Sequence, residues 1–238
     1  MCFSPEASFA GGVIISAIGI LTVRKVHKAS QILFATIPLF FGFQQIAEGF
    51  VWLTLPLPDH LIIQKIFVYI FLTTALVIWP VMIPLSMLLM EKSKKKRRLL
   101  VYLLWTGAVL SGYYILCMIF FNVSPQITGY HIVYHNDFPK SLAMIATVIY
   151  LLVTITPLFM SSVKRIHLFG LMMTLSCIVT VIFFKQYLTS VWCFFAAIIS
   201  VIIYWILSDL RRSYLLTRFR LLRIPVTDKE ISHKRHKG

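Results

Sequence analysis

Long apolar runs separated by short polar segments dominate the pattern of hydrophobic and polar positions along the chain. A helix needs about 20 predominantly apolar residues to cross the hydrocarbon core of a bilayer. Runs of this length predict an all-α bundle of seven transmembrane helices, at residues 5–23, 31–54, 62–90, 99–121, 141–160, 166–184 and 189–208.

Prolines and small residues inside these runs predict how the helices bend and pack. Pro80 and Pro84 lie in the third run, which is also the longest, so we expect that helix to be kinked or tilted. Small residues at a spacing of four let two helix backbones approach closely. They recur in the first and fourth runs, at Ser8, Gly12, Ser16, Gly107 and Ser111.

Composition supports a membrane protein and argues against a nucleic-acid partner. The chain is 59% hydrophobic and only 13% charged, whereas soluble domains average about 25% charged residues. A net charge of +15 accompanies no nucleic-acid-binding motif. We therefore expect the lipid bilayer to be the partner, with anionic lipids at the cytoplasmic face attracting the basic residues.

The distribution of the basic residues predicts the orientation. Of the 23 lysines and arginines, 20 fall in the segments 24–28, 92–98, 164–165 and 211–237, and Lys65, Lys140 and Lys185 lie on the other side. By the positive-inside rule the N-terminus is outside and the C-terminus cytoplasmic. The sequence thus predicts a multi-pass cell-membrane protein with a transmembrane domain at 1–208 and a basic cytoplasmic tail at 209–238.

Glu48 is the first residue that predicts chemistry, because it lies inside the second apolar run. A charged side chain within a membrane-spanning helix is costly and marks a functional site by default. Gln44 and Gln45 precede Glu48 by four and three residues, so both can share its side of the helix. The alternative is structural, with the glutamines binding the carboxylate to lock two helices together.

The segment 122–140 is the longest one on the predicted outer side, and it carries His131, His135 and Asp137. If this segment is helical, the two histidines fall on one face and can bind one metal ion. If it is extended, we expect them to point to opposite sides. Two solvated loop histidines are the simpler alternative.

The chain opens with Cys2, shortly before Glu6 and the first apolar run. The predicted topology puts Cys2 on the same side of the membrane as Glu48 and the two loop histidines. Thiolate, imidazole and carboxylate together are ligands of zinc, or of copper where sulfur dominates. A disulfide from Cys2 to Cys117 or Cys193 is the competing use of this thiol.

Two short motifs carry a resemblance to a known family. The chain begins Met1-Cys2-Phe3-Ser4, and its second run contains the element at residues 44–49, Gln-Gln-Ile-Ala-Glu-Gly. Both resemble an uncharacterised family of bacterial multi-pass integral membrane proteins. The resemblance is clearest in the first two runs and implies a bacterial inner-membrane location but no activity.

The leading functional hypothesis is a metal- or small-ligand-binding site at the outer face. Its candidate ligands are Cys2, Glu48, His131 and His135, with zinc or copper as the possible metal and Gln44, Gln45, Glu6 and Asp137 in support. Such a site could sense or carry a metal, or hydrolyse a substrate through metal-bound water. The alternatives are a secondary transporter with Glu48 as its coupling carboxylate, and a non-catalytic membrane scaffold that binds lipid.

Overall fold

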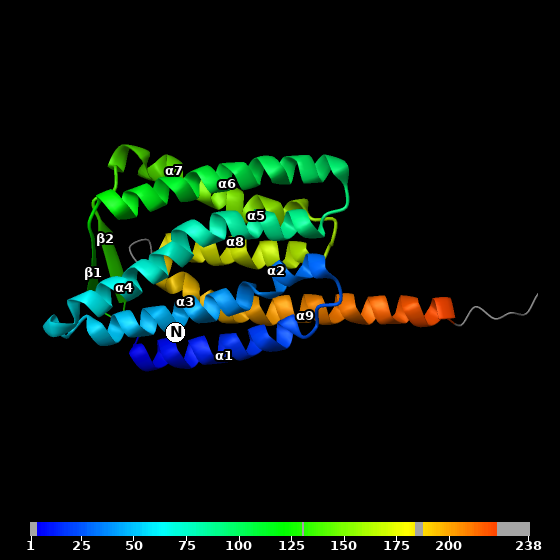
Figure 1. The fold of residues 1–238 in the computed structure, drawn as a ribbon, viewed down its shortest axis with the longest axis horizontal. Helices are drawn as coiled ribbons and strands as arrows, with labels where there is room; N and C mark the ends of the chain where they lie inside the picture. The colour runs from blue at the N-terminus through cyan, green and yellow to red at the C-terminus, as the bar shows by residue number, and fades with distance from the viewer. Residues whose placement is uncertain (1–3, 130, 184–187, 223–238) are drawn as a thin grey trace, which may run out of the picture.

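The computed structural model of the chain describes residues 4–129, 131–183 and 188–222. This part of the chain is mostly helical, with one β-hairpin across one end of the helices (Figure 1). The first half contains α1 (Pro5–Val23), η1 (Ala29–Gln31), α2 (Ile32–Ala35), α3 (Ile37–Thr54), η2 (Pro58–His60), α4 (Leu61–Leu72), the π-helix η3 (Thr73–Ile78) and α5 (Trp79–Met90). The second half contains α6 (Lys94–Phe120), β1 (Val123–Thr128), β2 (His131–Asn136), α7 (Lys140–Met160), α8 (Ile166–Phe183) and α9 (Leu188–Leu222).

Five helical segments among the described residues are long and apolar enough to cross a membrane. They are Pro5–Val23, Ala29–Thr54, Leu61–Met90, Lys94–Phe120 and Lys140–Met160. Helices α8 and α9 occupy the sixth and seventh predicted ranges, and the described apolar part of α8, Ile166–Thr180, is shorter. The prediction of a mainly helical, membrane-type chain is therefore confirmed. The two strands of the hairpin were not part of the predicted all-α bundle.

The helices enclose one main apolar core. Helix α1 packs against α3 and α9, helix α5 packs against α6 and α7, and α8 contacts both α7 and α9. Buried side chains from these helices and from α2 form this core, including Ile15, Phe34, Ile83, Phe169 and Ile203. A second apolar cluster joins α3, α4 and α6 to strand β2.

Helices α1 and α3 pack closely together, as the small residues of α1 predict. A Cβ on Gly12 would lie 2.6 Å from Cγ1 of Ile46 and 3.1 Å from the carbonyl oxygen of Gly42. A Cβ on Gly42 would in turn meet Ser16 and the carbonyl oxygen of Gly12. Only glycine lets the two backbones approach this closely.

The third predicted span is not a regular helix, and its prolines explain why. Pro80 has no N–H to donate to the preceding turn, and the chain widens there into the π-helix η3. Side chains of neighbouring helices bond the carbonyls of η3 instead. The Tyr150 hydroxyl donates to the Ala75 carbonyl at 2.8 Å, and the Ser111 hydroxyl donates to the Val77 carbonyl at 2.7 Å. Helix α4 is inclined to α5 across this segment (Figure 1).

The segment between α6 and α7 forms an antiparallel hairpin, with Val123 opposite Asn136 and Thr128 opposite His131. Gly129 follows β1 with a φ of 61°, a left-handed conformation that glycine adopts without strain. Ile132 is buried against the helices, and Tyr134 stacks on Phe71 with ring centroids 5.0 Å apart. We call the end of the bundle that carries this hairpin the hairpin end.

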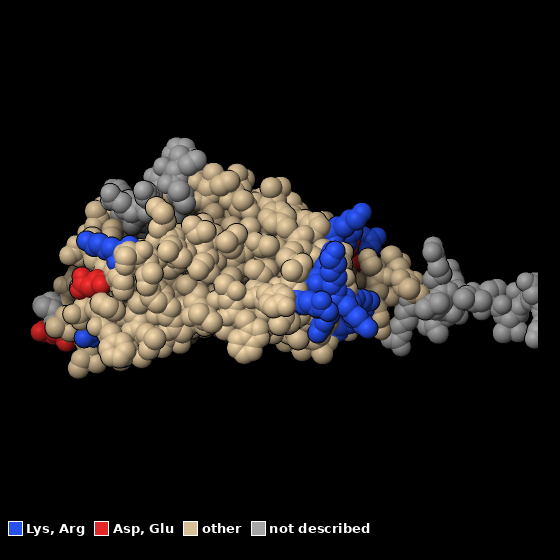
Figure 2. Space-filling model, turned by 90° about the horizontal axis from the view of Figure 1, so that it is seen from above, with Lys and Arg blue, Asp and Glu red and all other residues tan. Residues whose placement is uncertain are grey.

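Charge divides the two ends of the molecule. Lysines and arginines gather at the end where α9 leaves the bundle, which we call the basic end (Figure 2). Helix α9 continues without a break past residue 208 to Leu222, because no glycine or proline interrupts it. The described start of the predicted tail is thus part of the last helix.

Candidate functional site around Glu48

Three polar residues on α3 form a patch that has almost no exposed surface. Gln44 is 4% exposed, and Gln45 and Glu48 are both 0% exposed. Their spacing places them on adjoining turns of one side of the helix. The Gln45 amide Nε2 donates a hydrogen bond to the Glu48 carboxylate oxygen Oε2 at 3.2 Å. The predicted support of Glu48 by a glutamine is therefore present for Gln45.

Gln44 connects the patch to α5. The Trp79 indole Nε1 donates to the Gln44 oxygen Oε1 at 3.0 Å. Trp79 is the first residue of α5, directly after η3, and its ring packs at 4.4 Å from the ring of Phe41. Gln44 thus joins this polar part of α3 to the proline-containing third span. Sequence reasoning did not predict this bond, because its partners are 35 residues apart.

Strand β2 contacts α9 and shares an apolar cluster with this part of α3. Ile132 shares the apolar cluster with Ala47 and Val51, which lie one residue before and three residues after Glu48. Side chains alternate between the two faces of a strand. Because Ile132 and Tyr134 face the helices, His131 and His135 lie on the opposite face of the hairpin.

The hairpin corrects our expectation for the two histidines. Residues four apart in a strand share a face, so His131 and His135 do not point to opposite sides. They are instead about 13 Å apart along the strand, at about 3.3 Å per residue. Zinc–ligand bonds are about 2.0–2.3 Å long. The two histidines therefore cannot bind one ion together, and the helical alternative is wrong because residues 131–136 form β2.

The other predicted ligands differ in exposure. His131 is half-buried, and this burial is the main cause that lowers its pKa from the ordinary value of 6.5. A neutral imidazole at pH 7 is able to bind a metal. In contrast, His135, Asp137 and Glu6 are exposed.

The predicted thiol ligand, Cys2, lies outside the described residues. Cys117 is a free, buried thiol. Within residues 4–129, 131–183 and 188–222, no three His, Cys, Asp or Glu side chains come together closely enough to hold a metal ion. Metal binding by Cys2 and Glu48 therefore stays a prediction.

Glu91, at the basic end, is a second buried carboxylate, and sequence reasoning missed it. Its oxygen Oε1 accepts from the backbone N–H groups of Lys92 and Ser93, both at 2.8 Å, and from the Ser162 hydroxyl at 2.9 Å. Its oxygen Oε2 accepts from the Ser162 backbone N–H at 2.8 Å. The carboxylate thus ties the connection between α5 and α6 to the connection between α7 and α8.

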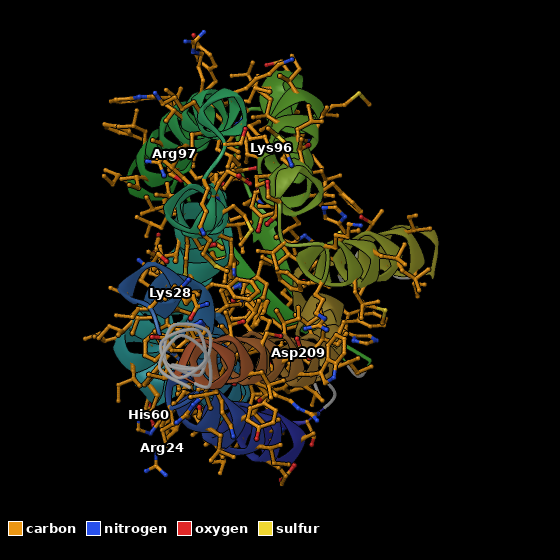
Figure 3. The ribbon with its side chains drawn as sticks, turned by 90° about the vertical axis from the view of Figure 1, so that its right-hand side faces the viewer. Arg24, Lys28, His60, Lys96, Arg97 and Asp209 are labelled. Carbon is orange, nitrogen blue, oxygen red and sulfur yellow. The ribbon has the colours of Figure 1, made fainter. Side chains whose placement is uncertain are left out.

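Two basic side chains complete this link (Figure 3). The Lys96 ammonium donates to the Ser162 hydroxyl at 3.1 Å. The Arg97 guanidinium donates to the carbonyls of Leu88 and Glu91 at 2.8 and 3.1 Å, near the end of α5. Burial by itself raises the pKa of Glu91. The hydrogen bonds from Ser93, Ser162 and Lys92 together lower it by more, so the pKa is below its ordinary value of 4.5. The signal in the sequence was a single acid directly before the basic run at 92–98.

The five long apolar helical segments are those expected of a membrane protein. Residues 1–215 match the model of a family of unknown function (DUF6629), and the chain belongs to this family. The expectation of an uncharacterised family is therefore confirmed. No curated protein and no solved structure matches the chain significantly.

Proposed function

We propose that the chain is a seven-span protein of the bacterial inner membrane, with its hairpin end outside and its basic end in the cytoplasm. The five long apolar segments, and the coincidence of α8 and α9 with the other two predicted spans, support the spans. The gathering of basic residues at one end supports the orientation.

The function centres on Glu48, which with Gln44 and Gln45 binds a small cationic ligand in the hairpin half of the bundle. The observation that carries this proposal is a carboxylate with no exposed surface inside a membrane-type helix. Placing an ionised carboxylate there costs several kcal/mol, about 2.5–3.5 for Asp at a helix centre. A bound cation offsets this cost. Gln45 holds one carboxylate oxygen in a fixed direction.

Among small cations, we propose a transition-metal ion, zinc or copper, as the ligand of this site. Its proposed further ligand is the thiolate of Cys2. Of the two histidine candidates, His131 is half-buried and His135 is exposed, but both lie on the face of β2 opposite Ile132, which packs in the cluster beside Glu48. A cysteine thiolate and a carboxylate suit zinc, and a larger share of sulfur suits copper.

Elemental analysis of the full-length protein in detergent tests this proposal. After incubation with Zn²⁺ or Cu⁺ and removal of the excess, we expect about one ion per chain in the wild type and a loss of most of it in Glu48→Gln and Cys2→Ser. Glu6→Gln and His135→Ala are matched controls, since both residues are exposed near the same end, and they should keep the ion. A wild-type protein that binds neither metal removes the metal proposal.

A second function is favoured by the hydrogen bond that joins Gln44, beside Glu48, to the irregular third span. π-Helices are frequent at functional sites, and η3 directly precedes Trp79, the residue that donates to Gln44. In this proposal Glu48 exchanges a proton, and the third span moves in response, as in a proton-coupled transporter.

Hydrogen exchange distinguishes the second function without a known substrate. We compare amide protection factors in the segment 73–90 at pH 8 and pH 5, corrected for the intrinsic pH dependence of exchange, and expect them to change in the wild type. Glu48→Gln cannot exchange a proton and should show the same protection factors at both values. Equal pH responses of the wild type and Glu48→Gln would contradict the transporter proposal.

A further inference from the structure

Basic side chains from the turn after α1 meet helix α9 at the basic end of the molecule (Figure 3). The Lys25 ammonium lies 5.5 Å from the ring centre of Tyr204, and the Lys28 ammonium lies 5.9 Å from that of Tyr214. The Arg211 guanidinium donates to the Arg24 carbonyl at 3.0 Å. We call Lys25, Lys28 and Arg211 the α1–α9 basic cluster.

The positive charge of this cluster is not neutralised by a carboxylate of the described residues. Their one ion pair joins Arg165 to Asp209, and Glu91 is bonded to Ser162 and to backbone N–H groups. His27 lies within the cluster and stacks on Tyr214 at 4.9 Å. Burial is the largest cause that lowers the pKa of His27, and the positive charges of Lys28 and Arg211 lower it further.

The tyrosine rings hold the cations in place while leaving their donors available. A cation over an aromatic ring is attracted by the negative face of the ring. Arg211 uses a nitrogen of its guanidinium for the Arg24 carbonyl, and a guanidinium has five N–H donors in all. The cations are thus held in place before a ligand binds, and several of their N–H groups remain available to bind it. Arginine and lysine donors of this kind recognise phosphate.

In the proposed membrane arrangement, the cluster lies where the first span ends. Arg24 and Lys25 directly follow α1, one of the segments long and apolar enough to span a bilayer. Ile20 and Leu21, four and three residues before Arg24, are 50% and 48% exposed. Residues at these spacings share one side of a helix. An apolar surface therefore leads directly to the basic cluster, which suits an acyl chain joined to an anionic headgroup.

We propose that the α1–α9 basic cluster binds the headgroup phosphate of an anionic phospholipid in the leaflet at the basic end. The site rests on the proposed membrane insertion, but not on the Glu48 site, which lies in the other half of the bundle. Lysines at the start of α6 offer a natural comparison. Lys94, Lys95 and Arg98 are exposed at the same end of the molecule but belong to another element.

The test measures lipid retention by the full-length protein in detergent. The protein is incubated with equal amounts of phosphatidylglycerol and phosphatidylcholine of the same acyl chains, and bound lipid is counted by native mass spectrometry. The wild type should prefer phosphatidylglycerol. Lys25→Gln/Lys28→Gln/Arg211→Gln should reduce its affinity for this lipid roughly tenfold or more, since each basic residue near an anionic surface contributes about 1 kcal/mol.

The control is Lys94→Gln/Lys95→Gln/Arg98→Gln, which removes the same charge and should keep the wild-type preference. Lys25→Arg/Lys28→Arg should keep it too, which separates a loss of charge from a loss of folding. Equal losses in both triple variants, or no preference in the wild type, would overturn the site. Glycerol phosphate that competes at the same concentration as the lipid would overturn the lipid as its occupant.

Discussion

Glu48 has no exposed surface, so the stability of the protein depends on the form in which this carboxyl group is buried. In metal-free detergent we expect Glu48→Gln to unfold at the wild-type temperature or above it. The substitution removes a buried charge and keeps an oxygen that accepts from Gln45. Glu48→Ala removes that oxygen and should lower the free energy of unfolding by about 1–3 kcal/mol. A thermal unfolding series compares the three proteins, and a Glu48→Gln variant as unstable as Glu48→Ala would show that the negative charge itself is stabilised.

His131 predicts how stability depends on pH. Its pKa in the folded protein is below the ordinary value of 6.5, so the unfolded chain binds its proton at higher pH than the folded chain does. Stability from this residue is therefore complete above pH 6.5 and is lost as the pH falls below that value. We expect the melting temperature to fall between pH 7 and pH 5, and to fall less in His131→Asn.

The matched control for this pH series is His135→Asn, on the exposed end of the same strand. It should keep the wild-type pH dependence. Because the pKa of His27 is lowered as well, a smaller decline should remain in His131→Asn and should shrink further when His27 is also replaced. A His131→Asn protein with the full wild-type decline would show that this imidazole is not the group responsible.

At the scale of the elements, the sequence predicted the helices better than their contacts. Apolar runs determine where a membrane-type helix begins and ends, so α1 and α7 lie within one residue of their predicted bounds. The hairpin was harder to predict, because the burial of β1 and β2 does not alternate along their full length. The π-helix η3 depends on donors from α6 and α7 that are far away in sequence.

The hydrogen bonds of the candidate site also divide into local ones that the sequence predicts and long-range ones that it does not. The spacing of Gln45 and Glu48 on one helix predicted their hydrogen bond, because local geometry determines it. The bond from Trp79 to Gln44 and the two bonds from Ser162 to Glu91 join segments that only the tertiary structure brings together.

Two glycines of α6 allow the packing of α5 against α6 to be tested. A Cβ on Gly107 would collide with the carbonyl group of Pro80, whereas a Cβ on Gly112 would meet nothing within 4 Å. Pro84 has no N–H to bond that Pro80 carbonyl, which leaves room for α6 to approach it. We expect Gly107→Ala to destabilise the protein by about 1–3 kcal/mol. Gly112→Ala should stabilise it by up to about 1 kcal/mol, since alanine favours a helix.

Unfolding in mixed micelles with rising fractions of a denaturing detergent measures both alanine variants under one condition. The opposite signs are the informative result, because both substitutions add the same methyl group to the same helix. Equal effects of the two would show that α6 does not pack against Pro80 as closely as described.

For the whole molecule, the length of α9 and the separation of charge fit one direction across the membrane in the proposed seven-span arrangement. Helix α9 has 35 residues, which is about 52 Å at 1.5 Å per residue, and the hydrocarbon core is only about 30 Å thick. In that arrangement its final turns extend beyond the core, and they leave the bundle at the basic end (Figure 1). The same end carries the α1–α9 basic cluster and the Glu91 link, so its loops are held by polar bonds to one another.

Cysteine labelling in a variant that lacks the four native cysteines tests the proposed orientation of this whole arrangement. Single cysteines replace exposed residues, Asp137 at the hairpin end, and Lys94 and Thr217 at the basic end. A membrane-impermeant maleimide should label Asp137→Cys on intact cells, and should label Lys94→Cys and Thr217→Cys only after the cells are opened. The reverse pattern would place the Glu48 half of the bundle on the cytoplasmic side. A ligand for Glu48 would then come from inside the cell, and the α1–α9 basic cluster would face the outer leaflet.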